Sequence, residues 1–112
     1  MTTPISTYKA FWPFYVSQHQ SKLNRNFHFV GTTFVLACFF MGFAKSARFF
    51  LGIPLCGYGF AWFGHLVFER NLPATWRYPF WSLAADFQMF AFMCLGRMDR
   101  EVKRMGVLQS EI

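Results

Sequence analysis

The chain has few charged residues and few cysteines. Charged side chains make up 14% of its 112 residues, and only 5 are acidic against 11 lysines and arginines. The three cysteines, Cys38, Cys56 and Cys94, show no CxxC spacing, which argues against a disulfide framework and against a cysteine-bound zinc. We therefore expect the cysteines to be small, reduced, apolar side chains.

Apolar residues are abundant, at 54% of the chain, and 17 residues are phenylalanines. They gather in three windows, 27–44, 49–68 and 79–96, each near the ~20 residues that a helix needs to cross a bilayer. The first two windows carry no formal charge, and the third carries only Asp86. The pattern predicts an all-α membrane protein, a small bundle with three spanning or deeply embedded helices. We expect it in the inner membrane if the source is bacterial, or in the endoplasmic reticulum if it is eukaryotic.

The net charge of +6 raises the question of nucleic-acid binding, but no nucleic-acid-binding motif accompanies the charge. The basic residues instead lie near the ends of the apolar windows, where they fit contact with lipid headgroups. They are Lys45, Arg48, Arg70, Arg77, Arg97, Arg100, Lys103 and Arg104. We therefore predict a membrane as partner and no nucleic acid.

The first two windows are separated only by residues 45–48, which leave room for nothing but a tight turn. They therefore predict an antiparallel hairpin. In the second window, Gly57, Ala61 and Gly64 recur at helical spacing and form a small-residue face that a neighbouring helix can approach closely. That neighbour is either a helix of the same chain or a second copy in a homodimer. Residues 1–112 are too few for two cores, so we expect one membrane-embedded domain.

Both ends of the chain show amphipathic patterns. An aromatic stripe at helical spacing predicts a short N-terminal helix at the membrane interface. The stripe consists of Tyr8, Phe11, Trp12, Tyr15 and His19. A polar break over 21–26 follows, in which Asn24 or Asn26 is expected to cap the next helix. After Gly96 the pattern predicts a short amphipathic surface helix, with an apolar face made of Leu95, Met98, Val102 and Met105.

The three histidines, His19, His28 and His65, border apolar stretches or lie inside them, where an imidazole is costly unless it has a partner. In the predicted hairpin His28 lies 18.5 residues before the turn midpoint and His65 lies 18.5 residues after it, so the two share one depth. The polar break lets the first helix fold back and bring His19 to the same level. Three converging imidazoles suit zinc or ferrous iron. Taken singly, each histidine is better explained as an interfacial or hydrogen-bonded structural residue, and it is their shared depth that favours convergence.

Four further polar residues accompany the histidines. Glu69 lies one helical turn after His65, and we expect it to be a fourth ligand or an acceptor for an imidazole N–H. Asp86 is expected to make a structural hydrogen bond, with a role at the metal as the alternative. Arg70 and Arg77 are candidates for binding a substrate carboxylate, with headgroup anchoring as the alternative.

The sequence resembles the membrane-embedded 2-hydroxy fatty acid dioxygenases, whose fungal members act in the α-oxidation of phytosphingosine-derived acids. The resemblance covers about Tyr15 to Phe90. It rests on His19-x4-Asn24-x3-His28 and on Phe63-Gly64-His65-Leu66-Val67-Phe68-Glu69, followed by Pro73-Ala74, Ser82-Leu83 and Met89-Phe90.

This resemblance implies an Fe(II)-dependent dioxygenase that uses molecular oxygen to convert a 2-hydroxy long-chain fatty acid into an acid one carbon shorter. By motif position, His19, His28 and His65 would hold the iron, with Glu69 and Asn24 as further ligands or as groups that orient the ligands. Two alternatives stay open. One is a membrane protein with histidine-ligated haem, and the other is a membrane protein without oxygenase activity whose histidines bind zinc or nothing.

Overall fold

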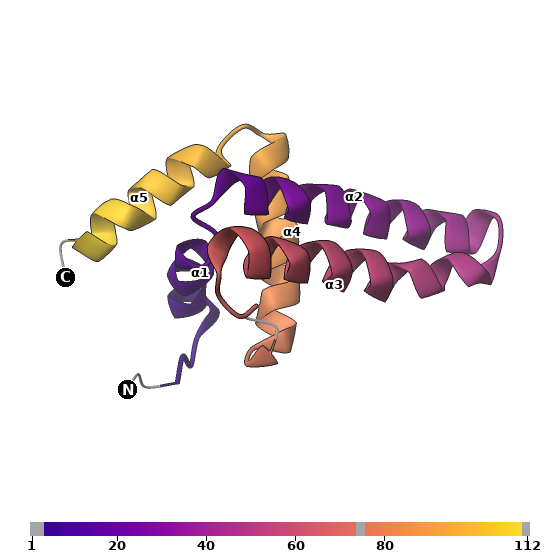
Figure 1. Ribbon diagram of the computed structural model, residues 1–112, viewed down its shortest axis with the longest axis horizontal. Helices are drawn as coiled ribbons and strands as arrows, with labels where there is room; N and C mark the ends of the chain where they lie inside the picture. The colour runs from indigo at the N-terminus through magenta and orange to yellow at the C-terminus, as the bar shows by residue number, and fades with distance from the viewer. Residues whose placement is uncertain (1–3, 74–75, 111–112) are drawn as a thin grey trace. The chain divides into compact units, whose positions relative to one another are not determined.

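The computed structural model describes residues 4–73 and 76–110, and every regular element in them is helical. This confirms the predicted all-α class. The chain divides into two compact units (Figure 1). One contains α1 (Tyr8–Ser17), α4 (Pro79–Cys94) and α5 (Met98–Ser110), and the other, Ser21–Pro73, contains α2 (Lys22–Ala44), η1 (Ala47–Leu51), α3 (Gly52–Gly64) and η2 (His65–Glu69). That both units belong to one membrane-embedded domain stays a prediction.

The unit Ser21–Pro73 is the predicted helical hairpin, in which α2 and α3 run side by side in opposite directions (Figure 1). At the turn, extended Ser46 caps η1 by accepting a hydrogen bond from the Arg48 N–H at 3.3 Å. Glycines let the two helices approach closely: a Cβ built on Gly31 would lie 2.8 Å from the Cβ of Phe60, and one on Gly57 would lie 3.3 Å from Val35. The small-residue face of α3 therefore packs against α2 of the same chain. This is the first of the two predicted alternatives, a neighbouring helix within one chain.

Two segments of the described chain are long and apolar enough to cross a bilayer, Lys22–Ala44 and Ala47–Glu69, with 23 residues each. At ~1.5 Å per residue each is about 35 Å long, which exceeds the ~30 Å hydrocarbon core. Only 17% and 11% of their most apolar windows are buried, whereas a core helix of a soluble protein is mostly buried. Their exposed large side chains include Phe34, Phe40, Phe43, Leu51, Leu55 and Leu66.

The third predicted span, 79–96, is not among these segments. Helix α4 has 16 residues, so its length of about 24 Å falls short of the ~30 Å core. It ends at Cys94 because Gly96 adopts the left-handed φ of 70° and stops the helix. One face of α4, with Ser82, Ala85 and Met89, is buried.

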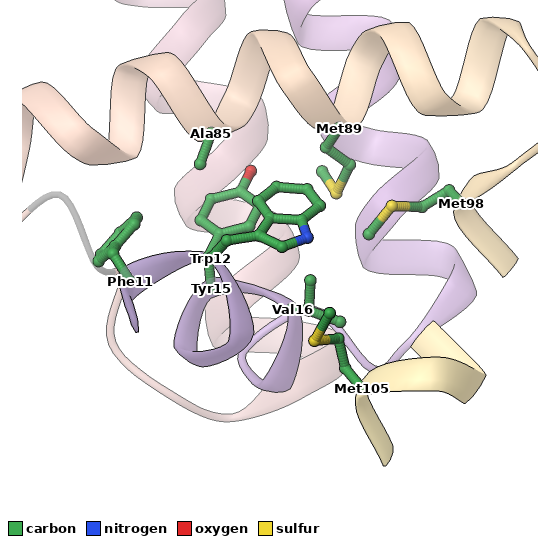
Figure 2. Close-up of a cluster of buried hydrophobic side chains, with 8 residues drawn as sticks. All are labelled: Phe11, Trp12, Tyr15, Val16, Ala85, Met89, Met98 and Met105. Carbon is green, nitrogen blue, oxygen red and sulfur yellow. The ribbon is translucent and has the colours of Figure 1, made fainter. Parts of the chain in front are cut away.

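The other unit has its hydrophobic core between α1, α4 and α5 (Figure 2). Three residues of the predicted N-terminal stripe, together with Val16, supply the α1 part of this core, and methionines make up most of the rest. The core consists of Phe11, Trp12, Tyr15 and Val16 from α1, Ala85 and Met89 from α4, and Met98 and Met105 from α5. The indole N–H of Trp12 also donates to Glu101 of α5 at 2.7 Å. The stripe therefore packs against protein, where the sequence predicted contact with a membrane interface.

The C-terminal amphipathic helix is α5, and two of its predicted apolar residues, Met98 and Met105, are buried. The predicted apolar face also includes Leu95, but this residue is 64% exposed. It precedes the turn at Gly96 and so belongs to the end of α4. The prediction of one continuous apolar face is wrong at this residue.

Candidate metal centre

Two of the three histidines face each other inside the hairpin. The imidazole centroids of His28, in the second turn of α2, and His65, at the start of η2, lie 4.9 Å apart with the rings nearly perpendicular. Both side chains are buried, at 5% and 2% exposure. The equal depth predicted from their distance to the turn is therefore confirmed. A buried pair of imidazoles at this separation can contribute two nitrogens to one metal ion.

Each of these imidazoles has its Nδ1 atom next to an oxygen. Nδ1 of His28 lies 3.0 Å from the backbone carbonyl oxygen of Asn24, and Nδ1 of His65 lies 2.7 Å from the side-chain Oδ1 of Asn71. Because a carbonyl oxygen can only accept, Nδ1–H is the donor in both bonds. In a neutral imidazole this tautomer places the lone pair on Nε2, the atom that then binds a metal.

The contact between His65 and Asn71 depends on an unusual end of the α3 helix. Segment η2 is a π-helical turn, in which the carbonyl oxygen of His65 accepts from the backbone N–H of Arg70 and, at 3.2 Å, of Asn71. Arg70 ends it in the left-handed conformation, with φ 59° and ψ 42°. This bend brings the Asn71 side chain back onto His65. Such π turns are rare and often occur at functional sites.

Asn24 and Glu69 join the two histidine-bearing helices. Asn24 is fully buried, and its Nδ2 donates to Oε2 of Glu69 at 3.1 Å. The same oxygen accepts the backbone N–H of Ser21 at 2.6 Å. The prediction that Asn24 or Asn26 caps this helix is wrong, because α2 begins earlier, at Lys22. Its cap is Ser21, whose Oγ accepts the Asn24 N–H at 3.4 Å.

His19 belongs to the other unit and follows α1. It is 1% exposed, its ring stacks on that of Tyr15 with centroids 4.0 Å apart, and its Nδ1 lies 2.6 Å from the Tyr15 carbonyl oxygen. The Tyr15 hydroxyl in turn donates to Oδ1 of Asp86. Asp86 thus makes the structural hydrogen bond expected of it. Its partner, Tyr15, is also the residue whose ring stacks on that of His19.

The two candidate arginines lie at the surface. Arg70 is exposed at the end of η2, and Arg77 is exposed with its guanidinium 5.7 Å from the centre of the Tyr78 ring. Their predicted role in binding a substrate carboxylate stays a prediction.

Sequence reasoning missed two residues of the site, Asn71 and Ser21. Asn71 is six positions after His65, a separation that no regular α-helix brings into contact. Ser21 carries a stronger signal, since a serine at the start of a helical pattern is a preferred cap, and it stands in the polar break already recognised.

An all-α protein whose hairpin carries a buried histidine pair with preset tautomers has the features of a helical metalloprotein. A family model described as 2-hydroxy-palmitic acid dioxygenase Mpo1-like matches residues 5–98. This range covers most of the chain, which therefore belongs to the Mpo1-like family, and the resemblance found in the sequence is confirmed. Comparisons with curated proteins and with solved structures give no match.

Proposed function

We propose that the protein is an Fe(II)-dependent dioxygenase that shortens 2-hydroxy long-chain fatty acids by one carbon. The iron would be held by His19, His28 and His65. Membership of a family described as 2-hydroxy-palmitic acid dioxygenase-like supports the reaction and the substrate class. The observation that supports the metal assignment is the hydrogen bonding of the three imidazoles.

All three imidazoles have Nδ1 within hydrogen-bond distance of an oxygen. The partners are the carbonyl of Tyr15 for His19, the carbonyl of Asn24 for His28 and Oδ1 of Asn71 for His65. Histidines that bind metals almost always donate their second ring N–H in this way, which fixes the ring and the tautomer. A buried structural histidine also needs a hydrogen-bond partner, but here the same atom, Nδ1, is bonded in all three. This shared arrangement supports Nε2 as the ligand atom of each histidine.

The covalent chain supports His19 as the third ligand. Only Gln20 separates His19 from Ser21, whose backbone N–H is bound to Glu69 in the hairpin. Because consecutive Cα atoms are ~3.8 Å apart, the Cα atoms of His19 and Ser21 lie within about 7.6 Å. A donor set of three neutral nitrogens that leaves coordination positions open is suited to ferrous iron.

We further propose that the α2–α3 hairpin is inserted in a bilayer. Its two segments are long enough to cross, and they expose large apolar side chains such as Phe40, Phe43 and Leu55 at 64%, 74% and 75%. A fatty acyl chain dissolved in the same bilayer reaches the hairpin without entering water. The histidine pair lies at the end of the hairpin opposite the turn, so we place it near a membrane surface, where an acyl carboxylate also lies.

Iron bound by the histidines would supply the one-electron chemistry that lets molecular oxygen react with an organic substrate. The protein residues hold the imidazoles in one tautomer and exclude water from them by burial. The exposed guanidinium of Arg70, next to η2, is our candidate for the substrate carboxylate. The overall change balances when the 2-hydroxy acid and one molecule of oxygen give the shortened acid, carbon dioxide and water.

The test is a turnover assay with the full chain, purified anaerobically in detergent and loaded with Fe(II). Incubation with 2-hydroxyhexadecanoic acid and ¹⁸O-labelled oxygen should give pentadecanoic acid that contains ¹⁸O. His28→Ala and His65→Ala should give none, while Gly59→Ala, at an exposed position with no neighbour within 4 Å of an added Cβ, should match the wild type. Absence of product from an iron-loaded wild type would refute the reaction.

A further inference from the structure

The carboxylate of Glu69 joins the two ends of the hairpin unit. Its Oε2 atom accepts the backbone N–H of Ser21 at 2.6 Å and the side-chain N–H of Asn24 at 3.1 Å. Ser21 and Asn24 are the cap and the first turn of α2, whereas Glu69 is the last residue of η2, 45 or more positions later. A negative charge at this place also faces the positive end of the α2 dipole.

Asn24 connects this carboxylate to both histidines. Its backbone carbonyl accepts the Nδ1–H of His28 at 3.0 Å. Its Oδ1 lies against Gly64, the residue before His65, so closely that a Cβ at Gly64 would be 2.1 Å away. Asn24 itself is fully buried. Asn24 thus contacts His28 through its backbone and the residue before His65 through its side chain.

We propose that Glu69 is a positioning residue rather than a metal ligand: it clamps the first turn of α2 to η2 and so sets the distance between the His28 and His65 imidazoles. One of its oxygens already accepts two hydrogen bonds, from the cap and from the first turn of α2. The role at the metal rests on the function proposed above, whereas the clamp itself is a property of the hairpin.

Two substitutions distinguish a clamp from a ligand. Glu69→Gln keeps an oxygen that can accept from Ser21 and Asn24 but removes the negative charge. Glu69→Ala removes the acceptor altogether. Glu101→Gln, in α5, controls for the loss of one acidic charge. The probe is Co(II) added to the metal-free full chain in detergent, because its visible spectrum reports the ligand set of the site.

The clamp predicts that Glu69→Gln keeps the wild-type Co(II) spectrum and an affinity close to that of the wild type. Glu69→Ala should bind Co(II) about 10–100-fold more weakly, as is typical when a group that orients a ligand is lost. In an Asn24→Ala background the further loss on Glu69→Ala should be smaller, because one of the two contacts that Glu69 makes is already absent.

The proposal is overturned if Glu69→Gln changes the spectrum and binds as weakly as Glu69→Ala, since Glu69 would then be a ligand. It is also overturned if Glu69→Ala binds like the wild type. Should the wild type bind no Co(II), the proposed metal function fails instead. The clamp is then judged by thermal unfolding of the metal-free chains, where it requires Glu69→Ala to unfold at a lower temperature than Glu69→Gln.

Discussion

Replacing Gly64 by alanine tests how closely the two helices approach at the candidate metal centre. The added Cβ would lie 2.1 Å from Oδ1 and 3.2 Å from Cγ of Asn24, but 3.5 Å from its Cα. The backbone thus tolerates the methyl group, and the buried Asn24 side chain has to move. We expect this movement to break its hydrogen bond to Glu69 and so to loosen the contact between the first turn of α2 and η2.

The size of the effect follows from two opposing terms. Loss of a hydrogen bond to a charged group costs about 1.5–3 kcal/mol, while alanine gains up to about 1 kcal/mol over glycine in helix propensity. With the full propensity gain, the net prediction for Gly64→Ala is a destabilisation of about 0.5–2 kcal/mol. Gly59 is the matched control: it lies in the same helix, and an added Cβ meets nothing within 4 Å. Gly59→Ala should therefore gain up to about 1 kcal/mol.

The assay is denaturant unfolding of both variants in the same detergent, followed by circular dichroism. Gly64→Ala should unfold at lower denaturant concentration than the wild type, and Gly59→Ala at the same or a higher one. Co(II) affinity should fall in Gly64→Ala alone. Equal stability of the two variants would refute the packing of Asn24 on Gly64, and with it the argument that connects this contact to the histidines.

Two further predictions concern single contacts. Hydrogen bonds from Arg104 and then Trp12 lower the pKa of Glu101, so their stabilising effect is present above the ordinary glutamate pKa and is lost as the pH falls through the lowered value. Tryptophan fluorescence should report this acid transition in the wild type and not in Glu101→Gln; an identical transition in both would contradict it. In the hairpin, Sγ of Cys38 lies against Gly52 of α3, 2.7 Å from where a Cβ would stand, and Cys56 is one helical turn further along α3. A short bifunctional thiol reagent should therefore link Cys38 and Cys56 within one chain, as peptide mass analysis can verify. Links formed only between chains would contradict the hairpin register.

The hairpin and its histidine pair could be predicted from the sequence for a simple reason. Two uncharged apolar windows separated by four residues allow only a tight turn, and equal residue counts on either side of it place His28 and His65 at one level. Helical rise per residue is nearly constant, so the argument needs no knowledge of side-chain packing.

Features that depend on local departures from the regular helix could not be predicted. The π turn and the left-handed Arg70 bring Asn71 to His65, and neither conformation has a clear signal in the residue types. Apolar composition continues through Leu95 and predicts too late an end for α4, whereas the left-handed Gly96 stops the helix at Cys94. An apolar or aromatic side chain can be buried in protein or in contact with lipid, and composition alone does not distinguish the two. For this reason the aromatic stripe of α1 predicts a membrane interface, although it packs in a protein core.

The most direct test of the account is the metal content of the chain, measured by mass spectrometry on protein purified anaerobically in detergent. We predict about one iron per chain in the wild type and loss of that iron in His19→Ala, His28→Ala and His65→Ala, with Gly59→Ala unchanged. A wild type that contains no metal, or histidine variants that retain their iron, would contradict the central claim. Zinc in place of iron would contradict the dioxygenase and support a membrane protein with a non-catalytic metal.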